Sequence, residues 1–321
     1  MSIDYSLFYR RAVDIDSLQD DLVEFDVYIS AFNSSQRVTK VFSEVRAKKK
    51  IWLIHPEYAY TADEMPQEAS IVTPTDTNEI SQTNALLSAV GDDLTGLKIC
   101  IDITGFMRHV LVFLIAALKL RKVTEVTALY SEPDAYAKQE HTVFSTATGK
   151  ARVLNGMGGK TFQKADEMLI LAVGYDYKLI NEVTSDRDYM SVYPIFGFPS
   201  LSPDMYQQSA IKSSESGSAT FAASWVGNRR FAPANDPFAT ADVISEIVKE
   251  KEKRKRNQPT NIYLSPLSTK AQALGFALFW LYEKSPQRSI AMLLPSLETY
   301  SRETTTGLKR LWAYTLELDL P

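Results

Sequence analysis

Four residues in one short stretch have the chemistry to contact a ligand: Asp102, Thr104, Gly105 and Arg108. They end or follow the sequence KICIDI of residues 98–103, which is apolar apart from Lys98 and Asp102. A carboxylate inside an apolar strand has to be paired, hydrogen-bonded or functional. Pairing with Arg108 or with a serine-rich turn is the structural alternative to a role in a site, and both readings stay open.

A second polar turn, Asn33-Ser34-Ser35, follows the apolar stretch FDVYISA of residues 25–31. Helix capping explains the serines without any ligand, whereas the N–H groups and hydroxyls of such a turn also suit an anion. We therefore keep Asn33 and Ser34 as candidate ligand-binding residues.

The three histidines, His55, His109 and His141, share no spacing typical of metal ligands, and HExxH and GxSxG motifs are absent from the sequence. We therefore expect neither a metal site nor a cofactor. His109 could act as a general base, but in the absence of a paired carboxylate a packed helix histidine is the preferred interpretation. Residues 155–161, NGMGGKT, end like a phosphate-binding loop; a strand rather than a long helix is expected after them, so we interpret them as a glycine turn.

The residues around Asp102 require a strand, a tight turn, a helix and a second strand. Residues 98–103 and 123–130 are strand-like, and residues 107–120 remain apolar over the length of a helix. In such a βαβ unit the strands are parallel, and ligands bind beyond their carboxyl ends. The turn that holds Thr104, Gly105 and Arg108 is therefore the best site candidate.

Similar elements are expected on both sides of this unit. Before it we expect a strand at 25–31, a helix at 36–48, a strand at 51–54, an irregular stretch at 57–77 and a helix at 78–90. After it we expect strands at 168–173, 190–196, 261–264 and 289–294, helices at 239–256, 270–282 and 302–316, and a long inserted loop at 200–236.

The two halves repeat one pattern. FDVYISAFN matches MLILAVGYD, KIWLIHPEY matches MSVYPIFGFP, CIDITGFMRHVLVFLIAAL matches IYLSPLSTKAQALGFALFWL, and VTALYSEP matches SIAMLLPS, in the same order. This order predicts an α/β protein with two Rossmann-like parallel-sheet units in tandem, residues 1–150 and 151–321, related by a pseudo-two-fold axis. One continuous doubly wound sheet is the alternative. A pseudo-two-fold would make Phe32, Asn33 and Arg108 face Tyr175, Asp176 and Lys270 across one cleft, which suits a ligand with phosphates and bases.

The two matching turns carry a resemblance to a known family. Thr104-Gly105-Phe106-Met107-Arg108 and Pro266-Leu267-Ser268-Thr269-Lys270 look like two degenerate copies of a Thr-Gly-Gly-Thr-Lys-like turn. In this the chain resembles the CRISPR-associated Rossmann fold (CARF), a sensor domain that binds cyclic oligonucleotides. The resemblance implies a regulatory role in antiviral defence, a nucleotide or cyclic oligonucleotide as ligand, a protein effector as partner, and Ser268, Thr269 and Lys270 as ligand-binding residues.

Composition narrows the possible functions. The net charge of −4 argues against a general nucleic-acid binder, and a single cysteine, Cys100, excludes disulfides within the chain and fits a cytoplasmic protein. The most apolar run, residues 110–118, is too short to span a membrane, and the first residues lack the pattern of a signal peptide.

Among the possible functions, we rank a ligand-binding sensor first. An enzyme acting on a nucleotide or nucleic-acid fragment, with Asp102, His109 or Glu298 in acid-base roles, is second, and a scaffold subunit that docks through residues 200–236 is third.

Overall fold

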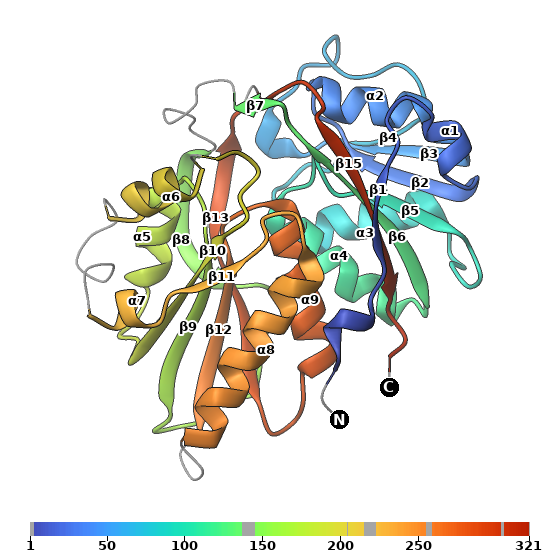
Figure 1. Ribbon diagram of the computed structural model, residues 1–321. Helices are drawn as coiled ribbons and strands as arrows, with labels where there is room; N and C mark the ends of the chain where they lie inside the picture. The colour runs from blue at the N-terminus through green and yellow to red at the C-terminus, as the bar shows by residue number, and fades with distance from the viewer. Residues whose placement is uncertain are drawn as a thin grey trace. The chain divides into compact units, whose positions relative to one another are not determined.

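The computed structural model describes residues 3–136, 145–203, 205–214, 223–254, 259–302 and 305–320. The chain divides into two compact units (Figure 1). Unit 1 consists of Met1–Leu7 and Thr148–Ser296, and unit 2 of Phe8–Ala147 and Leu297–Pro321. The chain therefore passes three times from one unit to the other, and neither unit is continuous in sequence.

Unit 2 contains a seven-stranded sheet with the order β1-β15-β6-β5-β2-β3-β4. The parallel strands are β2 (Phe25–Ala31), β3 (Ala47–Leu53), β4 (Ser70–Val72), β5 (Ile99–Asp102) and β6 (Glu125–Glu132). The chain builds the sheet outward from β2 through β3 to β4 and then returns to place β5 on the other side of β2. The strand order thus reverses between β2 and β5, the position at which doubly wound sheets bind ligands.

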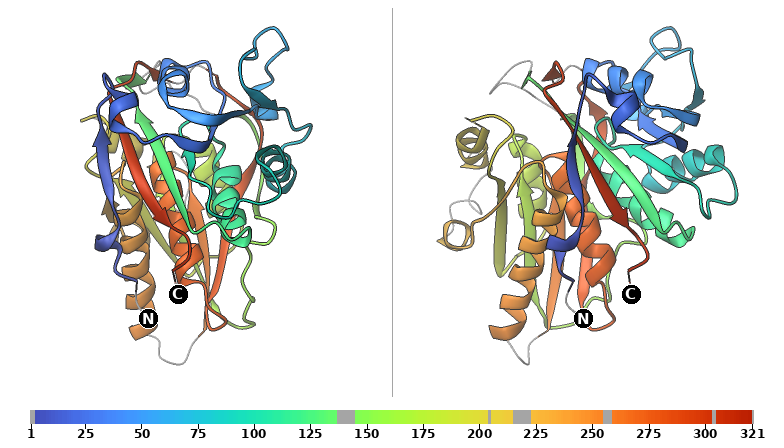
Figure 2. Two further views of the ribbon diagram at one scale, coloured as in Figure 1. Left: turned by 90° about the vertical axis from the view of Figure 1, so that its right-hand side faces the viewer. Right: turned by 45° about the vertical axis from the view of Figure 1, so that its right-hand side comes forward.

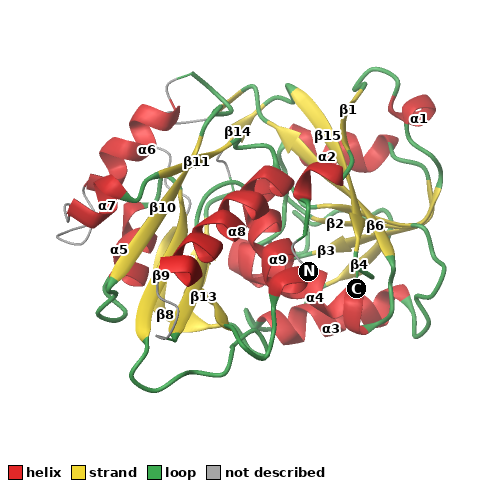
Figure 3. Cartoon of the chain, turned by 60° about the horizontal axis from the view of Figure 1, so that its bottom comes forward, coloured by secondary structure: helices red, strands yellow, loops and turns green. Residues whose placement is uncertain are grey.

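Helices cover both faces of this sheet (Figure 3). One face carries α2 (Gln36–Glu44), which buries Val38, Val41 and Phe42 against Tyr28, Trp52, Cys100 and Leu129. The other face carries α3 (Glu79–Val90) and α4 (Arg108–Leu120), which pack against each other. The remaining elements of unit 2 are the antiparallel strands β1 (Arg10–Val13) and β15 (Arg310–Glu317), α1 (Leu18–Asp21), η2 (Pro56–Tyr58) and the pair β7 (Ala135–Tyr136) and β14 (Thr305–Thr306).

Unit 1 contains a six-stranded sheet with the order β11-β10-β9-β12-β13-β8. Its parallel strands are β9 (Asp166–Val173), β10 (Ser191–Gly197), β11 (Arg230–Ala232), β12 (Thr260–Pro266) and β13 (Ser289–Tyr300), and β8 (Ser145–Val153) pairs with β13. Its helices are η1 (Tyr5–Leu7), α5 (Tyr177–Thr184), α6 (Met205–Ser214), α7 (Ala223–Gly227), α8 (Pro237–Arg254) and α9 (Lys270–Glu283). The parallel strands are added in the same order as in unit 2: β9, β10, β11, then β12 and β13 on the other side of β9.

Both units also share a close backbone contact at the point where the strand order reverses. A Cβ atom added to Gly105, after β5, would overlap the carbonyl oxygen of Ala31 at the end of β2. A Cβ atom added to Gly174, after β9, would overlap the carbonyl oxygen of Leu267 after β12. In the matches found in the sequence, Ala31 corresponds to Gly174 and Gly105 to Leu267. The same pair of positions is therefore in contact in both units, with the glycine on opposite sides.

The expected helix at 302–316 is wrong, because β15 (Arg310–Glu317) lies there as a strand between β1 (Arg10–Val13) and β6 (Figure 2). Its side chains alternate between the two faces: Leu311 and Ala313 join the core under α2, whereas the indole N–H of Trp312 donates to Glu132 Oε1 at 2.6 Å. This period of two is that of a strand.

Other expected boundaries also differ from the structure. The helix expected at 36–48 ends at Glu44, because β3 begins at Ala47 and pairs Ala47 with Phe25 of β2. The irregular stretch at 57–77 includes η2 and β4, and the described part of the loop expected at 200–236 includes α6, α7 and β11. Among the described residues, no helix combines the length and apolar composition needed to cross a membrane.

Candidate functional site

A buried polar layer lies at the carboxyl ends of β2, β5 and β6 in unit 2. Ser30, Asp102 and Ser131 each follow by two positions a residue of the core under α2, namely Tyr28, Cys100 and Leu129. Side chains two positions apart point to the same face of a strand. All three polar residues are fully buried and lie on the α2 face of the sheet, beyond the apolar core.

Asp102 is the acid of this layer. Its Oδ1 accepts from the N–H of Thr104 at 3.0 Å, and its Oδ2 accepts from the hydroxyl of Ser30 at 3.4 Å. Burial raises the pKa of Asp102 to about 6, although the bonds from Thr104 and Ser30 and the charge of Arg37 act in the opposite direction. Asp102 is therefore hydrogen-bonded by Thr104 and Ser30 rather than paired with Arg108.

Ser131 and Arg37 complete the layer and carry unused polar atoms. The Nη1 of Arg37 donates to the carbonyl oxygen of Ser131 at 2.8 Å, and the N–H of Ser131 donates to Thr104 Oγ1 at 3.0 Å. Among the described residues, however, Ser131 Oγ, Arg37 Nε and Ser35 Oγ are buried without a hydrogen-bond partner. Buried polar atoms are normally paired, so a further polar group is expected at each of these three.

Two helices of unit 2 begin at this edge without a side-chain cap. Within the described part of the chain, neither Ser35 before α2 nor Met107 before α4 accepts a capping hydrogen bond through its side chain. Arg37 and Arg108 lie in the first turns of these helices, and both guanidinium groups lower the pKa of Tyr136, which burial raises to about 12. Uncapped helix starts with arginines nearby favour anions.

The other predicted residues of unit 2 lie at the same edge. Asn33 is buried; its Oδ1 accepts from the N–H of Ser35 at 3.0 Å, and its Nδ2 donates to the carbonyl oxygen of Arg302 at 3.2 Å. Ser34 is exposed and donates its N–H to Tyr60 Oη at 3.3 Å. The overlap with Ala31 described above gives Gly105 a structural reason to be glycine.

The predicted residues of unit 1 lie at the carboxyl ends of β9 and β12, but two of them cap helices. Asp176 Oδ1 accepts from the N–H of Lys178 at 3.2 Å at the start of α5. Thr269 Oγ1 accepts from the N–H of Gln272 at 3.1 Å at the start of α9 and donates to the carbonyl oxygen of Ala234 at 2.5 Å. Met107 and Thr269 occupy matching positions, so the start of α9 is capped by its own chain where that of α4 is not.

The remaining predicted residues of unit 1, Tyr175, Ser268 and Lys270, are half-buried at the same edge. Lys270 is the first residue of α9, as Arg108 is the first residue of α4. The expectation that the residues of unit 2 face those of unit 1 across one cleft stays a prediction.

Sequence reasoning missed Ser30, Arg37 and Ser131 as site residues. The signal for two of them was present, because Ser30 and Ser131 are polar residues near the ends of strand-like segments, as Asp102 is. Arg37 could not be chosen among the arginines from the sequence. Its contact with Ser131 joins residues 94 positions apart.

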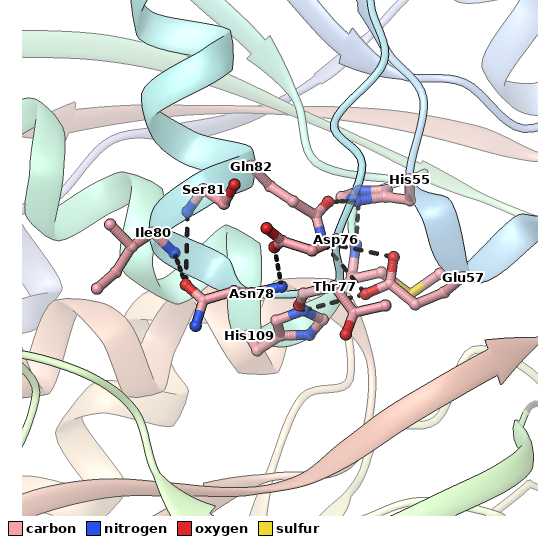
Figure 4. A network of polar contacts seen from close by, with 10 residues as sticks. His55, Glu57, Asp76, Thr77, Asn78, Ile80, Ser81, Gln82 and His109 are labelled. Carbon is pink, nitrogen blue, oxygen red and sulfur yellow. Dashed lines mark hydrogen bonds and ion pairs between the residues drawn. The ribbon is translucent and has the colours of Figure 1, made fainter.

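His109 has the paired carboxylate that the sequence did not reveal (Figure 4). Its Nε2 lies 3.1 Å from Glu57 Oε1 and 3.0 Å from the carbonyl oxygen of Thr77. His55 and Gln82 extend this buried network, and His141 lies outside the described residues.

The described residues contain no group of three or more His, Cys, Asp or Glu that could hold a metal ion. After Val153, residues 154–165 contain no helix, in agreement with a glycine turn at 155–161 rather than a phosphate-binding loop.

A cavity of about 810 Å³ opens elsewhere in unit 2, between the second half of α2 and β3. It is lined by Phe32, Phe42, Trp52 and Lys50, among others, and the eleven predicted site residues do not line it. The Lys50 amine donates to the carbonyl oxygens of Phe42 and Ser43 at the end of α2, which is a structural use of its charge.

No family model, no curated protein and no solved structure matches this chain.

Proposed function

We propose that the protein is a sensor whose unit 2 binds a small phosphate-bearing ligand of the nucleotide type. The observation that carries the proposal is the start of α2 and of α4 at the carboxyl edge of β2, β5 and β6. Both helices lack a side-chain cap among the described residues, both have an arginine in the first turn, and buried Ser131 Oγ and Arg37 Nε have no partner there. An anion at this edge would meet the N–H groups of two helix starts that have no side-chain cap among the described residues, and two guanidinium groups.

The shared order of the parallel strands in the two units supports a CARF-like sensor. The parallel strands are added in one order in both units, and corresponding positions make the close glycine contact. We infer that the two units are Rossmann-like copies of one ancestral unit, related by a pseudo-two-fold axis. CARF-like sensors bind cyclic oligonucleotides, so a cyclic oligoadenylate is the first ligand to test, and a role in antiviral defence follows from that ligand.

The proposal is tested by identifying and then titrating the ligand. Protein purified without nucleotide is denatured, and released small molecules are identified by mass spectrometry. Calorimetric titration then uses cyclic tetra-adenylate and, as the bare anion, inorganic pyrophosphate. Arg108→Ala should weaken binding roughly 10- to 100-fold, because a charge-assisted hydrogen bond contributes about 1.5–3 kcal/mol.

Arg121→Ala is the matched control, since Arg121 is exposed at the opposite end of the same helix. It should leave affinity unchanged. Equal affinities for the wild type and for Arg108→Ala, or no binding of any nucleotide or phosphate compound, would reject the sensor.

An enzyme acting on a nucleotide is the second candidate, and one observation favours it. His109 and Glu57 form a buried histidine–carboxylate pair, the arrangement by which an acid orients a general base. Incubation with cyclic tetra-adenylate followed by chromatography separates the candidates. An enzyme would cleave it in the wild type and not in His109→Gln, whereas a sensor would return it intact. Of the other expected acid-base groups, Asp102 is buried and Glu298 is exposed.

A sensor in the cytoplasm needs an effector, and unit 1 exposes a surface that suits a protein partner. Phe198, Tyr206 and Phe231 are in mutual ring contact at the end of β10, in α6 and in the edge strand β11, and Phe198 and Phe231 are exposed. Exposed apolar groups gathered in this way mark interaction surfaces. This surface lies within residues 200–236 and their flank, where the scaffold interpretation also placed a partner.

A further inference from the structure

Four buried side chains of unit 2 form a continuous hydrogen-bonded network (Figure 4), and this network contacts the turn at residues 104–108 through the N–H of Met107. His55 follows β3, Glu57 lies in η2, Gln82 in α3 and His109 in the first turn of α4. The fully buried side chains of His55, Glu57 and Gln82 meet the nearly buried ring of His109. The network therefore joins four elements that the sequence separates.

The direction of each hydrogen bond follows from one backbone donor. The N–H of Met107 donates to His55 Nε2 at 3.0 Å, so the proton of the neutral ring is on Nδ1. His55 Nδ1–H then donates to Gln82 Oε1 at 2.6 Å, and Gln82 Nε2 donates to Glu57 Oε1 at 3.3 Å. His109 Nε2 faces two acceptors, Glu57 Oε1 and the carbonyl oxygen of Thr77, so it also carries a proton.

The donors of the network converge on the Glu57 carboxylate. Burial alone would raise the pKa of Glu57, but the hydrogen bond from His109 and the electrostatic influence of the two imidazole rings outweigh it and hold that pKa below its usual value. Glu57 is thus an ionised acceptor that needs its donors. A change at any member leaves a buried polar group unpaired.

Three contacts from this side fix the turn that precedes α4. His55 accepts from the N–H of Met107, Tyr58 Oη donates to the carbonyl oxygen of Gly105 at 3.4 Å, and the ring of Phe106 packs edge-on against His55 at 5.6 Å between centroids. The His109 side chain anchors the first helical turn from the same side. The turn at Gly105, Phe106 and Met107 is therefore held by groups that do not belong to the candidate ligand site.

We infer that His55, Glu57, Gln82 and His109 are positioning residues for the ligand site of unit 2: they fix the turn at residues 104–108 so that Arg108 and the start of α4 are pre-organised for an anion. The inference rests on the proposed function. Because the network occupies the N–H of Met107, the anion is left to the later N–H groups of the helix and to Arg108. Pre-organisation strengthens binding because less order has to be imposed when the ligand arrives.

The test measures the rigidity of the turn and the affinity for the ligand in two separate experiments. Gln82→Leu removes the central link, and Gln67→Leu is the matched control, because Gln67 is exposed in a loop of the same unit. Amide hydrogen exchange over residues 104–110 is measured without ligand, and affinity for cyclic tetra-adenylate is measured by calorimetry. We expect the Met107 amide to exchange at least tenfold faster and the affinity to fall at least tenfold in Gln82→Leu, with both values unchanged in Gln67→Leu.

A conservative pair distinguishes positioning from general loss of stability. Glu57→Gln keeps an oxygen acceptor for His109 and should bind the probe better than Glu57→Leu, which has none. If Gln82→Leu does not fold, Gln82→Asn, which keeps both polar atoms on a shorter side chain, takes its place with the same expectation.

Unchanged exchange at Met107 would overturn the inference whatever the ligand does. Faster exchange with unchanged affinity would show that the network stabilises the turn without positioning the site. If the wild type binds neither cyclic tetra-adenylate nor pyrophosphate, the proposed function fails and the ligand part of the inference fails with it, while the exchange data still decide whether the network fixes the turn.

Discussion

At the scale of single residues, the ionisation of Asp102 is set by its surroundings rather than by a basic partner. It is fully buried, and its two hydrogen-bond donors, Thr104 and Ser30, are neutral. Its pKa is raised from 3.8 to about 6, so the folded protein holds this proton more tightly than the unfolded chain does. An anion bound nearby would favour the protonated form further.

The raised pKa gives a pH dependence with a defined sign. The stabilisation from protonated Asp102 is complete below the unfolded value of 3.8 and is lost as pH rises through about 6. A shift of about two units corresponds to roughly 3 kcal/mol. Asp102→Asn should therefore be more stable than the wild type at pH 8, by at most that amount, with a much smaller difference at pH 4. Urea unfolding at the two pH values measures this, and an Asp102→Asn that is less stable at pH 8 would contradict it.

The glycines at the strand-order reversal give a second prediction at this scale. Gly105→Ala and Gly174→Ala each place a methyl group on a backbone carbonyl oxygen, which cannot move aside as a side chain can. Each substitution should cost about 2–4 kcal/mol or prevent folding. Gly227→Ala is the control, because nothing lies within 4 Å of its added Cβ. If Gly105→Ala were neutral in urea unfolding, the close contact with Ala31 would be wrong.

At the scale of elements, the helices that begin at the two carboxyl edges differ in their caps. In unit 1, Asp176 caps α5 and Thr269 caps α9; in unit 2, the described residues provide no side-chain cap for α2 or α4. A capped helix start has used part of its capacity for an anion, whereas an uncapped one keeps it. This difference is the reason for placing the anion at unit 2.

Two alanine substitutions should distinguish a residue that caps a helix, Thr269, from a residue that contacts the ligand, Ser35. Thr269→Ala removes the acceptor for the N–H of Gln272 and should lower stability by about 1 kcal/mol without changing ligand affinity. Ser35→Ala removes a hydroxyl without a partner among the described residues and should leave stability unchanged while weakening the binding of cyclic tetra-adenylate. Thermal unfolding and calorimetry on the same samples provide both values. The reverse pattern would place the ligand in unit 1.

At the scale of the whole molecule, a shared cleft remains the prediction that depends on both units. Arg108 and Lys270 are the first residues of matching helices. If one ligand touches both, loss of one anchor lets it shift and lowers the value of the other. A double-mutant cycle of Arg108→Ala and Lys270→Ala should then give a coupling energy of about 0.5–3 kcal/mol. Strict additivity, or no effect of Lys270→Ala, would confine the ligand to unit 2.

Many elements of the fold could be predicted from the sequence, because parallel strands and the helices between them produce local patterns of apolar residues. The apolar runs at 25–31, 98–103, 168–173 and 261–264 correctly predicted β2, β5, β9 and β12, and two sheets with parallel strands were expected from the repeated pattern. The turn at 104–108 was identified because a carboxylate in an apolar strand needs a physical reason. These inferences used only neighbours in the chain.

Only the tertiary structure decided which distant groups meet. Ser30 reaches Asp102 across 72 positions and Arg37 reaches Ser131 across 94, so the polar layer exists only after β5 and β6 have joined β2. The partner of His109, the strand character of β15 and the division of the chain into discontinuous units depend on the same long-range pairing. A periodic pattern fixes which face of an element is apolar, but the hydrogen-bond partners of a buried polar group are set by whichever elements pack against that face.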